Sequence, residues 1–190
     1  GFSGTFTVNY NTQQRFKFAS TNAGSANASW VFYTSFNDGV GLTCGNGTLQ
    51  LGAMSGTAYI RNDYGTSTTT LEIGALNTNT VFTGIIQDNG NNNIGVRKVG
   101  PGTLAFTGAN TYDAGTQING GTLVFSNATA FGSGTISFGG GTLKHGLTFT
   151  NDLSSKFVNS TAPIAIDDSG QSITCATAIA SSNTGGLTKK

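Results

Sequence analysis

One tripeptide, Gly-Thr-Leu, recurs along this chain of 190 residues and constrains its fold more than any other feature. It stands at 47–49, 102–104, 121–123 and 141–143, and Gly134-Thr135-Ile136 is a close variant. The last three copies follow one another at a near-constant interval of about 20 residues, which is a coil length that solenoid proteins use. The sequence therefore predicts one strand-and-turn unit wound repeatedly around an axis.

Each copy opens a stretch in which apolar and small or polar residues alternate, as in a half-buried β-strand. One such strand cannot bury its apolar side alone, but it can when it stacks on the next coil about 4.8 Å away. The pattern predicts an all-β parallel solenoid with coils of roughly 20 residues. The residues expected to point inward in stacked rows are Leu104, Phe106, Leu123, Phe125, Ile136 and Phe138.

Composition excludes several other classes. Only 9% of the residues are charged and Gly, at 29 residues, is abundant, so long helices are not expected. The net charge of +1 comes without a basic patch, which excludes nucleic acid as an expected partner. No apolar run reaches the roughly 18 residues that span a bilayer, and this segment is not expected to insert into a membrane.

The sequence shows no composition break or linker, so residues 1–190 are predicted to form a single β-helical domain. Residues 1–40 are the most aromatic and least periodic part, and they are expected to form either irregular first coils or a cap. Residues 186–190 resemble residues 95–99, which lead into another coil. The chain is therefore expected to be a fragment of a longer repetitive protein.

The stretch from Lys98 to Leu143 resembles the autotransporter-associated β-strand repeat of bacterial surface and secreted proteins. The resemblance implies a right-handed parallel β-helix that is exported and lies outside the cell or on the bacterial surface. It implies a non-catalytic scaffold or adhesive segment and no reaction. The matching positions are Lys98, Gly100, 102–104, 108–112, 115–116 and 118–123.

Catalytic chemistry has few candidate residues. Asp167-Asp168 is the one adjacent carboxylate pair, as a polysaccharide-cleaving site would need, but Ser169-Gly170 follows and favours a turn. His145 is the only histidine, and it is expected on the surface or at a strand end. We therefore expect no enzyme, no metal and no cofactor, and a polysaccharide-active enzyme ranks third among the functions considered.

Carbohydrate binding is the second hypothesis, because exposed aromatic residues on a flat solenoid face can stack on sugar rings. Alternation places Tyr59 and Arg61 outward with Tyr64 close by, and it exposes Tyr33 beside the buried Trp30. In this alternative the chain is a carbohydrate-binding module attached to a polysaccharide-degrading enzyme. The expected partners are polysaccharides or cell-surface glycans, and the chain is expected to be a monomer.

The two cysteines, Cys44 and Cys175, are expected to remain free although the protein is predicted to be exported. Both share an alternating face with an apolar residue, so both thiols are expected inside the coil. Their separation by several coils is about 30 Å, well beyond the roughly 7 Å between Cα atoms that a disulfide permits.

Overall fold

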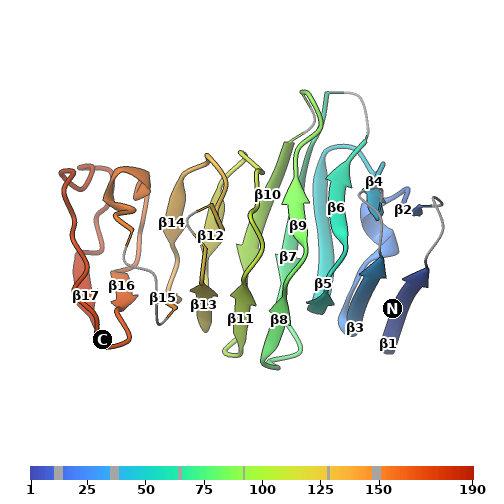
Figure 1. Cartoon of the computed structure of the whole chain (residues 1–190), viewed down its shortest axis with the longest axis horizontal. Coiled ribbons are helices and arrows are strands. Elements are labelled where there is room, and N and C mark those ends of the chain that lie inside the picture. The colour runs from blue at the N-terminus through green and yellow to red at the C-terminus, as the bar shows by residue number, and fades with distance from the viewer. Residues whose placement is uncertain (11–14, 35–38, 64–65, 92, 128, 147–150) are drawn as a thin grey trace.

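The computed structural model describes residues 1–10, 15–34, 39–63, 66–91, 93–127, 129–146 and 151–190. Within these ranges the chain forms a parallel β-solenoid with a mean coil length of about 23 residues and little helix. Figure 1 shows the coils stacked along one axis, with the N- and C-termini at opposite ends of the rod. The predicted all-β solenoid is confirmed.

Two sheets form three sides of the rod. A 13-stranded sheet supplies the first and second sides, and β5 turns the corner between them. The first side consists of β5 (Gly47–Gly56), β7 (Thr68–Ile73), β10 (Asn93–Lys98), β12 (Thr116–Ile118) and β14 (Ile136–Phe138). The second side consists of β1 (Gly4–Tyr10), β3 (Ser25–Thr34), the end of β5, β8 (Thr80–Phe82), β11 (Thr103–Phe106), β13 (Thr122–Phe125), β15 (Thr142–His145), β16 (Ile164–Asp167) and β17 (Leu187–Lys189).

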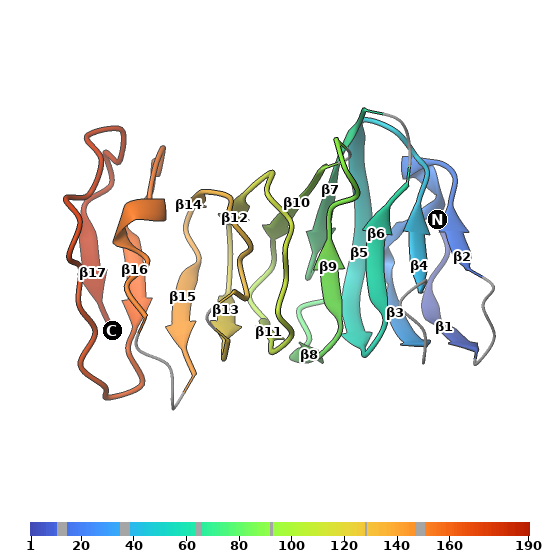
Figure 2. The same cartoon turned by 45° about the horizontal axis from the view of Figure 1, so that its top comes forward.

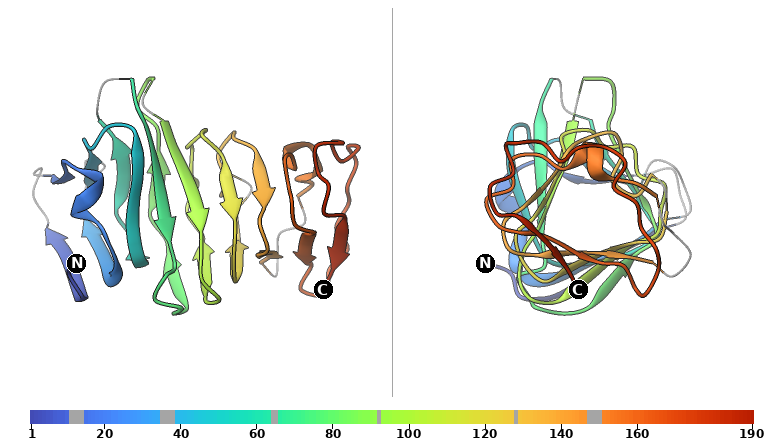
Figure 3. Two further views of the ribbon diagram at one scale, coloured as in Figure 1. Left: turned by 180° about the vertical axis from the view of Figure 1, so that it is seen from behind. Right: turned by 90° about the vertical axis from the view of Figure 1, so that its left-hand side faces the viewer.

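The third side is a separate four-stranded sheet that Figure 2 shows along one side of the rod. Short 3₁₀ turns, η1 (Thr21–Ala23) and η2 (Ser154–Lys156), lie between strands. The sheet consists of β2 (Phe16–Phe18), β4 (Val40–Leu42), β6 (Tyr59–Asn62) and β9 (Ile85–Gln87). The end-on view in Figure 3 shows the coils superposed around a common interior.

Register shows how the coil length varies along the rod. Gly56 pairs with Phe82 and Phe82 with Phe106, so the coils of this part are clearly longer than the predicted repeat of about 20 residues. Phe106 then pairs with Phe125, and Phe125 with His145, which restores that repeat. The predicted coil length thus describes the part that contains the last three Gly-Thr-Leu copies. The earlier coils, which contain a strand of the third side, are longer, and so are the last ones, in which Leu143 pairs with Ile166 and Ile166 with Lys189.

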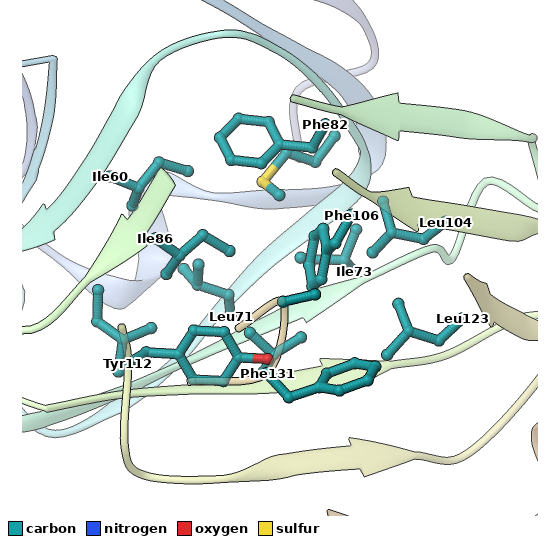
Figure 4. Close-up of a cluster of buried hydrophobic side chains, with 14 of the residues drawn as sticks. Ile60, Leu71, Ile73, Phe82, Ile86, Leu104, Phe106, Tyr112, Leu123 and Phe131 are labelled. Atoms are coloured by element: carbon teal, nitrogen blue, oxygen red, sulfur yellow. The ribbon is translucent and has the colours of Figure 1, made fainter. Parts of the chain in front are cut away.

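The interior is one hydrophobic cluster that runs along the rod. The six residues predicted to point inward are all buried, in two rows on different sides. Leu104 and Phe106 pair with Leu123 and Phe125 on the second side, whereas Phe138 stacks on Ile118 on the first. Figure 4 shows Leu71 and Ile73 from the first side and Leu104 and Leu123 from the second side in this interior, together with Ile60 and Ile86 from the third side.

Residues 1–40 use the same strand pairing as later coils over their described part. β1 pairs with β3 in parallel along its whole length, and β2 pairs with β4. Aromatic rings fill this end of the rod: Phe6 lies 5.1 Å from Trp30 between ring centroids, and Phe18 lies 5.2 Å from Trp30. Such tilted and edge-on contacts add to the stabilisation from burial.

The corner between the first and second sides depends on stacked glycines and a lysine. Gly100 has φ of +66°, and a Cβ atom there would lie 2.3 Å from the Gly74 carbonyl oxygen. The Lys98 ammonium is buried beneath this corner and donates to the carbonyl oxygens of Val99 at 2.6 Å and Gly100 at 2.8 Å. Burial lowers the pKa of Lys98 to about 8. The lysine of the repeat motif therefore satisfies corner carbonyls that no strand reaches.

The cysteine prediction is only partly right. Both thiols are free, as expected. Cys44 is half-buried against the core, but Cys175 is exposed, so the expectation of two interior thiols is wrong. The reason is local: residues 171–176 form no strand, and alternation does not carry Cys175 to the inner face.

Asparagine side chains replace missing backbone bonds between coils. Asn110 is buried; its Oδ1 accepts from the Ile86 amide at 2.8 Å, and its Nδ2 donates to the Ala130 carbonyl at 2.7 Å. One side chain therefore joins three successive coils. Without it, a buried N–H and a buried C=O would lose their partners.

We expect Asn110→Ala to lower the free energy of unfolding by about 2–4 kcal/mol, since two buried polar groups are left unpaired. Urea denaturation monitored by circular dichroism measures the change. Asn119→Ala is the matched control, because Asn119 is exposed; its expected effect is within about 0.5 kcal/mol. Equal effects of the two substitutions would contradict this role for Asn110.

Candidate functional site

The structure divides the residues predicted to bind sugar between two sides of the rod. Tyr59 and Arg61 lie on β6, on the third side, with half-buried side chains. Their outward direction is as predicted, since Ile60 between them is buried. Tyr33 is 45% exposed on β3, on the second side, and Tyr64 lies outside the described residues. Among the described residues of this set, only Tyr59 and Arg61 share one strand.

Arg61 belongs to a polar cluster centred on Asp63. The Arg61 Nε lies 3.0 Å from the Asp63 carboxylate, which also pairs with Arg15 and accepts from Asn89 at 3.1 Å. Lys17 on β2 and Arg61 on β6 flank Gly41 in register. In the sequence, Asp63 has the neighbours of an ordinary corner residue. The spacing of two residues between Arg61 and Asp63 was the feature of the sequence that could have indicated this ion pair.

A second polar arrangement crosses four coils on the outer face of the first side. Gln50 Nε2 donates to Glu72 at 3.0 Å, Arg97 Nη1 pairs with Glu72 at 3.1 Å, and Arg97 Nε donates to Gln117 at 2.8 Å. We call these four residues the outer ladder. The sequence pattern alone did not reveal it, although all four occupy outward positions of strands about one coil apart.

The adjacent carboxylates Asp167 and Asp168 are each held by a lysine. Lys144 Nζ lies 2.6 Å from Asp167, and Lys189 Nζ lies 2.8 Å from Asp168. Hydrogen bonds from these lysines, and from the backbone amides of the following turn, lower the pKa of both carboxyls. A general acid needs a raised pKa, so neither carboxyl has the electrostatic environment of one.

His145 stands at the end of β15, with its side chain inside the coil. Only 3% of it is exposed, and its ring centroid lies 4.5 Å from that of Phe125. It occupies the position that Phe125 and Phe106 hold in the coils before it. Within the described ranges, no three His, Cys, Asp or Glu residues are grouped so that they could hold a metal ion.

Asp88 and Asp113 come together at the corner after the third side. The Asp88 carboxylate accepts from the Ile94 amide at 2.6 Å and from the Asp113 amide, one coil on, at 2.7 Å. Burial and the Asp113 carboxyl raise the pKa of Asp88 from its ordinary 3.8 to about 6. In the folded protein this corner binds a proton more tightly than the unfolded chain does.

This linkage has a definite sign. Because the pKa of Asp88 is raised in the folded protein, protonation of Asp88 stabilises the fold. This stabilisation is fully present below about pH 3.8 and is lost as the pH rises through about 6. Three carboxyls have a lowered pKa, so the stability that they contribute is lost only when the pH falls further and does not change between about pH 5 and 7. They are Asp152, Asp167 and Asp168.

We expect Asp113→Asn to reduce the gain in melting temperature between about pH 7 and about pH 5, because it removes a carboxyl that helps to raise the pKa of Asp88. Differential scanning fluorimetry at both pH values measures it. Asp167→Asn is the control and keeps the gain of the unchanged protein. An identical gain in all three proteins would show that the Asp113 carboxyl does not raise the pKa of Asp88.

The fold is that of a parallel β-solenoid in which polar side chains, such as Asn110 and those of the outer ladder, bind neighbouring coils. Comparison with known families adds that residues 96–125, from β10 to β13, match the family described as passenger-associated-transport-repeat. The predicted resemblance is thus confirmed over the coil that carries Lys98 and two copies of Gly-Thr-Leu. The comparisons with curated proteins and with solved structures find no match.

Proposed function

We propose that this chain is a non-catalytic β-helical scaffold and adhesive segment of an exported bacterial protein, located outside the cell or on its surface. The match of residues 96–125 to a passenger-associated repeat supports the exported setting. No helix in the described part is long and apolar enough to cross a membrane.

The observation that carries the non-catalytic proposal is how the acidic side chains are used. Asp63, Asp167 and Asp168 are held by ion pairs, and Asp88 and Asp152 accept backbone amides from a later coil. Carboxylates in such roles hold the stack together. They are not directed as a pair toward one open cleft, as acid and base catalysis requires.

The test is incubation of the purified chain with pectin, alginate and xylan. We expect no release of reducing ends and no unsaturated uronates, as measured by reducing-sugar assay and absorbance. Release that disappears in Asp167→Asn or Asp168→Asn would refute the proposal and favour a polysaccharide-active enzyme.

The second candidate function is a carbohydrate-binding module. One observation favours it: Tyr59 and Arg61 both face outward on β6, so a phenol ring and a guanidinium lie two residues apart on the third side. A phenol ring can stack on a sugar ring, which suits glycan binding, and the neighbouring guanidinium is already paired with Asp63.

A pull-down with insoluble cellulose, chitin and xylan tests this function. If the third side binds, Tyr59→Ala should release the chain from the retained polysaccharide, whereas Tyr33→Ala, on the second side, should not. Retention that is equal in both variants, or no retention of the unchanged protein, would exclude the Tyr59 surface.

A further inference from the structure

A polar groove lies on the first side of the rod, beyond the last member of the outer ladder. Its volume is about 240 Å³, and it runs across the coils that contain β12 and β14. A glycine, Gly115, lines the bottom of the groove with φ of +87°. A Cβ atom there would lie 3.0 Å from the Thr135 carbonyl oxygen, so a larger residue would not fit at this position. Gln117, Thr135, Ser137 and Asn159 supply its polar side chains.

These four side chains have unused hydrogen-bonding groups. Gln117 Oε1 accepts from Arg97, but among the described residues its Nε2 donates to none. The hydroxyls of Thr135 and Ser137 and the carboxamide of Asn159 likewise have no partner within the described ranges. The groove therefore offers several donors and acceptors that the fold itself does not consume.

Three asparagines of the solenoid use their side chains between coils. Asn79 accepts from Thr103 at 2.8 Å, Asn110 joins three coils, and Asn183 accepts from Ser160 at 2.9 Å. Asn159 sits at a comparable inter-coil position, with φ of +56°, yet within the described part of the chain only its backbone amide is bonded, to Ser182. Its side chain is thus available at the rim of the groove.

The chemistry of the lining selects one class of ligand. Hydroxyls and carboxamides both donate and accept, which matches the hydroxyls of a sugar. None of the described residues that line the groove is charged, and the guanidinium of Arg97 beside it is paired with Glu72 and Gln117. A charged ligand would find no counter-ion among these residues, and an apolar ligand would leave polar groups unpaired.

We propose that this groove binds one unit of a neutral saccharide, with Gln117 and Asn159 as the two amide ligands and Thr135 and Ser137 as the hydroxyl ligands. The inference rests on the proposed scaffold and adds a ligand to it, at a place different from the Tyr59 surface. None of the described lining residues is an aromatic platform, so we expect weak binding, with a Kd of about 1–10 mM.

The test is titration of the ¹⁵N-labelled whole chain with cellotetraose, maltotetraose and mannotetraose, followed by NMR. At least one of them should shift the amide signals of Gly115, Gln117 and Ser137. Trigalacturonate, the charged comparison, should leave these signals in place at about 10 mM. Shifts with trigalacturonate of equal size, or no shift with any neutral sugar, would overturn the proposal.

Variants separate the groove from the rest of the ladder. Asn159→Gly removes the carboxamide without backbone strain, since glycine accepts a positive φ. This variant and Gln117→Met should each weaken binding about three- to tenfold, as expected when one hydrogen bond is lost. Gln50→Met, which removes the opposite end of the same ladder, is the matched control and should keep the affinity.

Two outcomes would show which part of the proposal is wrong. Unchanged affinity in Asn159→Gly and Gln117→Met would refute the groove even if the chain binds sugar, and shifts centred on Tyr59 would assign binding to the third side. Circular dichroism of the same samples shows whether the solenoid is intact. Absent binding by an intact solenoid overturns this inference and leaves the scaffold proposal standing, whereas cleavage of the sugars would overturn the scaffold.

Discussion

The structure depends on one constraint: each coil must lie on the previous one in parallel register. The column of Phe82, Phe106 and Phe125 shows why, since each ring is buried only when its strand pairs residue for residue with the next. A slip of one position would turn every apolar side chain outward and every polar one inward. Differences in coil length must therefore be absorbed at corners and loops.

Polar side chains bond the backbone groups of neighbouring coils where backbone pairing is incomplete. Lys98 satisfies carbonyl oxygens under a glycine corner, and Asn110 supplies both a donor and an acceptor where the third side has no strand. Lys156 makes similar bonds to the Gly132 and Gly134 carbonyls. Few charges are needed in such a chain, because most of its polar groups bind neutral backbone atoms rather than ions.

The sequence was most informative where periodicity and register coincide. Alternation around Leu104, Leu123 and Ile60 predicted both strand and buried face, because a strand has only two faces. Alternation predicted a buried Cys175, which is wrong, because no strand forms there to give the side chains two alternating faces. The outer ladder and the groove were also missed, since they depend on side chains that lie one coil apart and become neighbours only when the length of each coil is known.

The third side has consequences for the rod as a mechanical object. Its four strands end at β9, and among the described residues the later coils are joined on that side by isolated bonds such as those of Asn110. A continuous hydrogen-bonded sheet resists the separation of coils along the axis. Over its described residues the rod is therefore braced by strands on three sides up to β9, on two sides from there to β14, and on the second side alone after β14, so that bending under a sideways load is concentrated in the coils after β9.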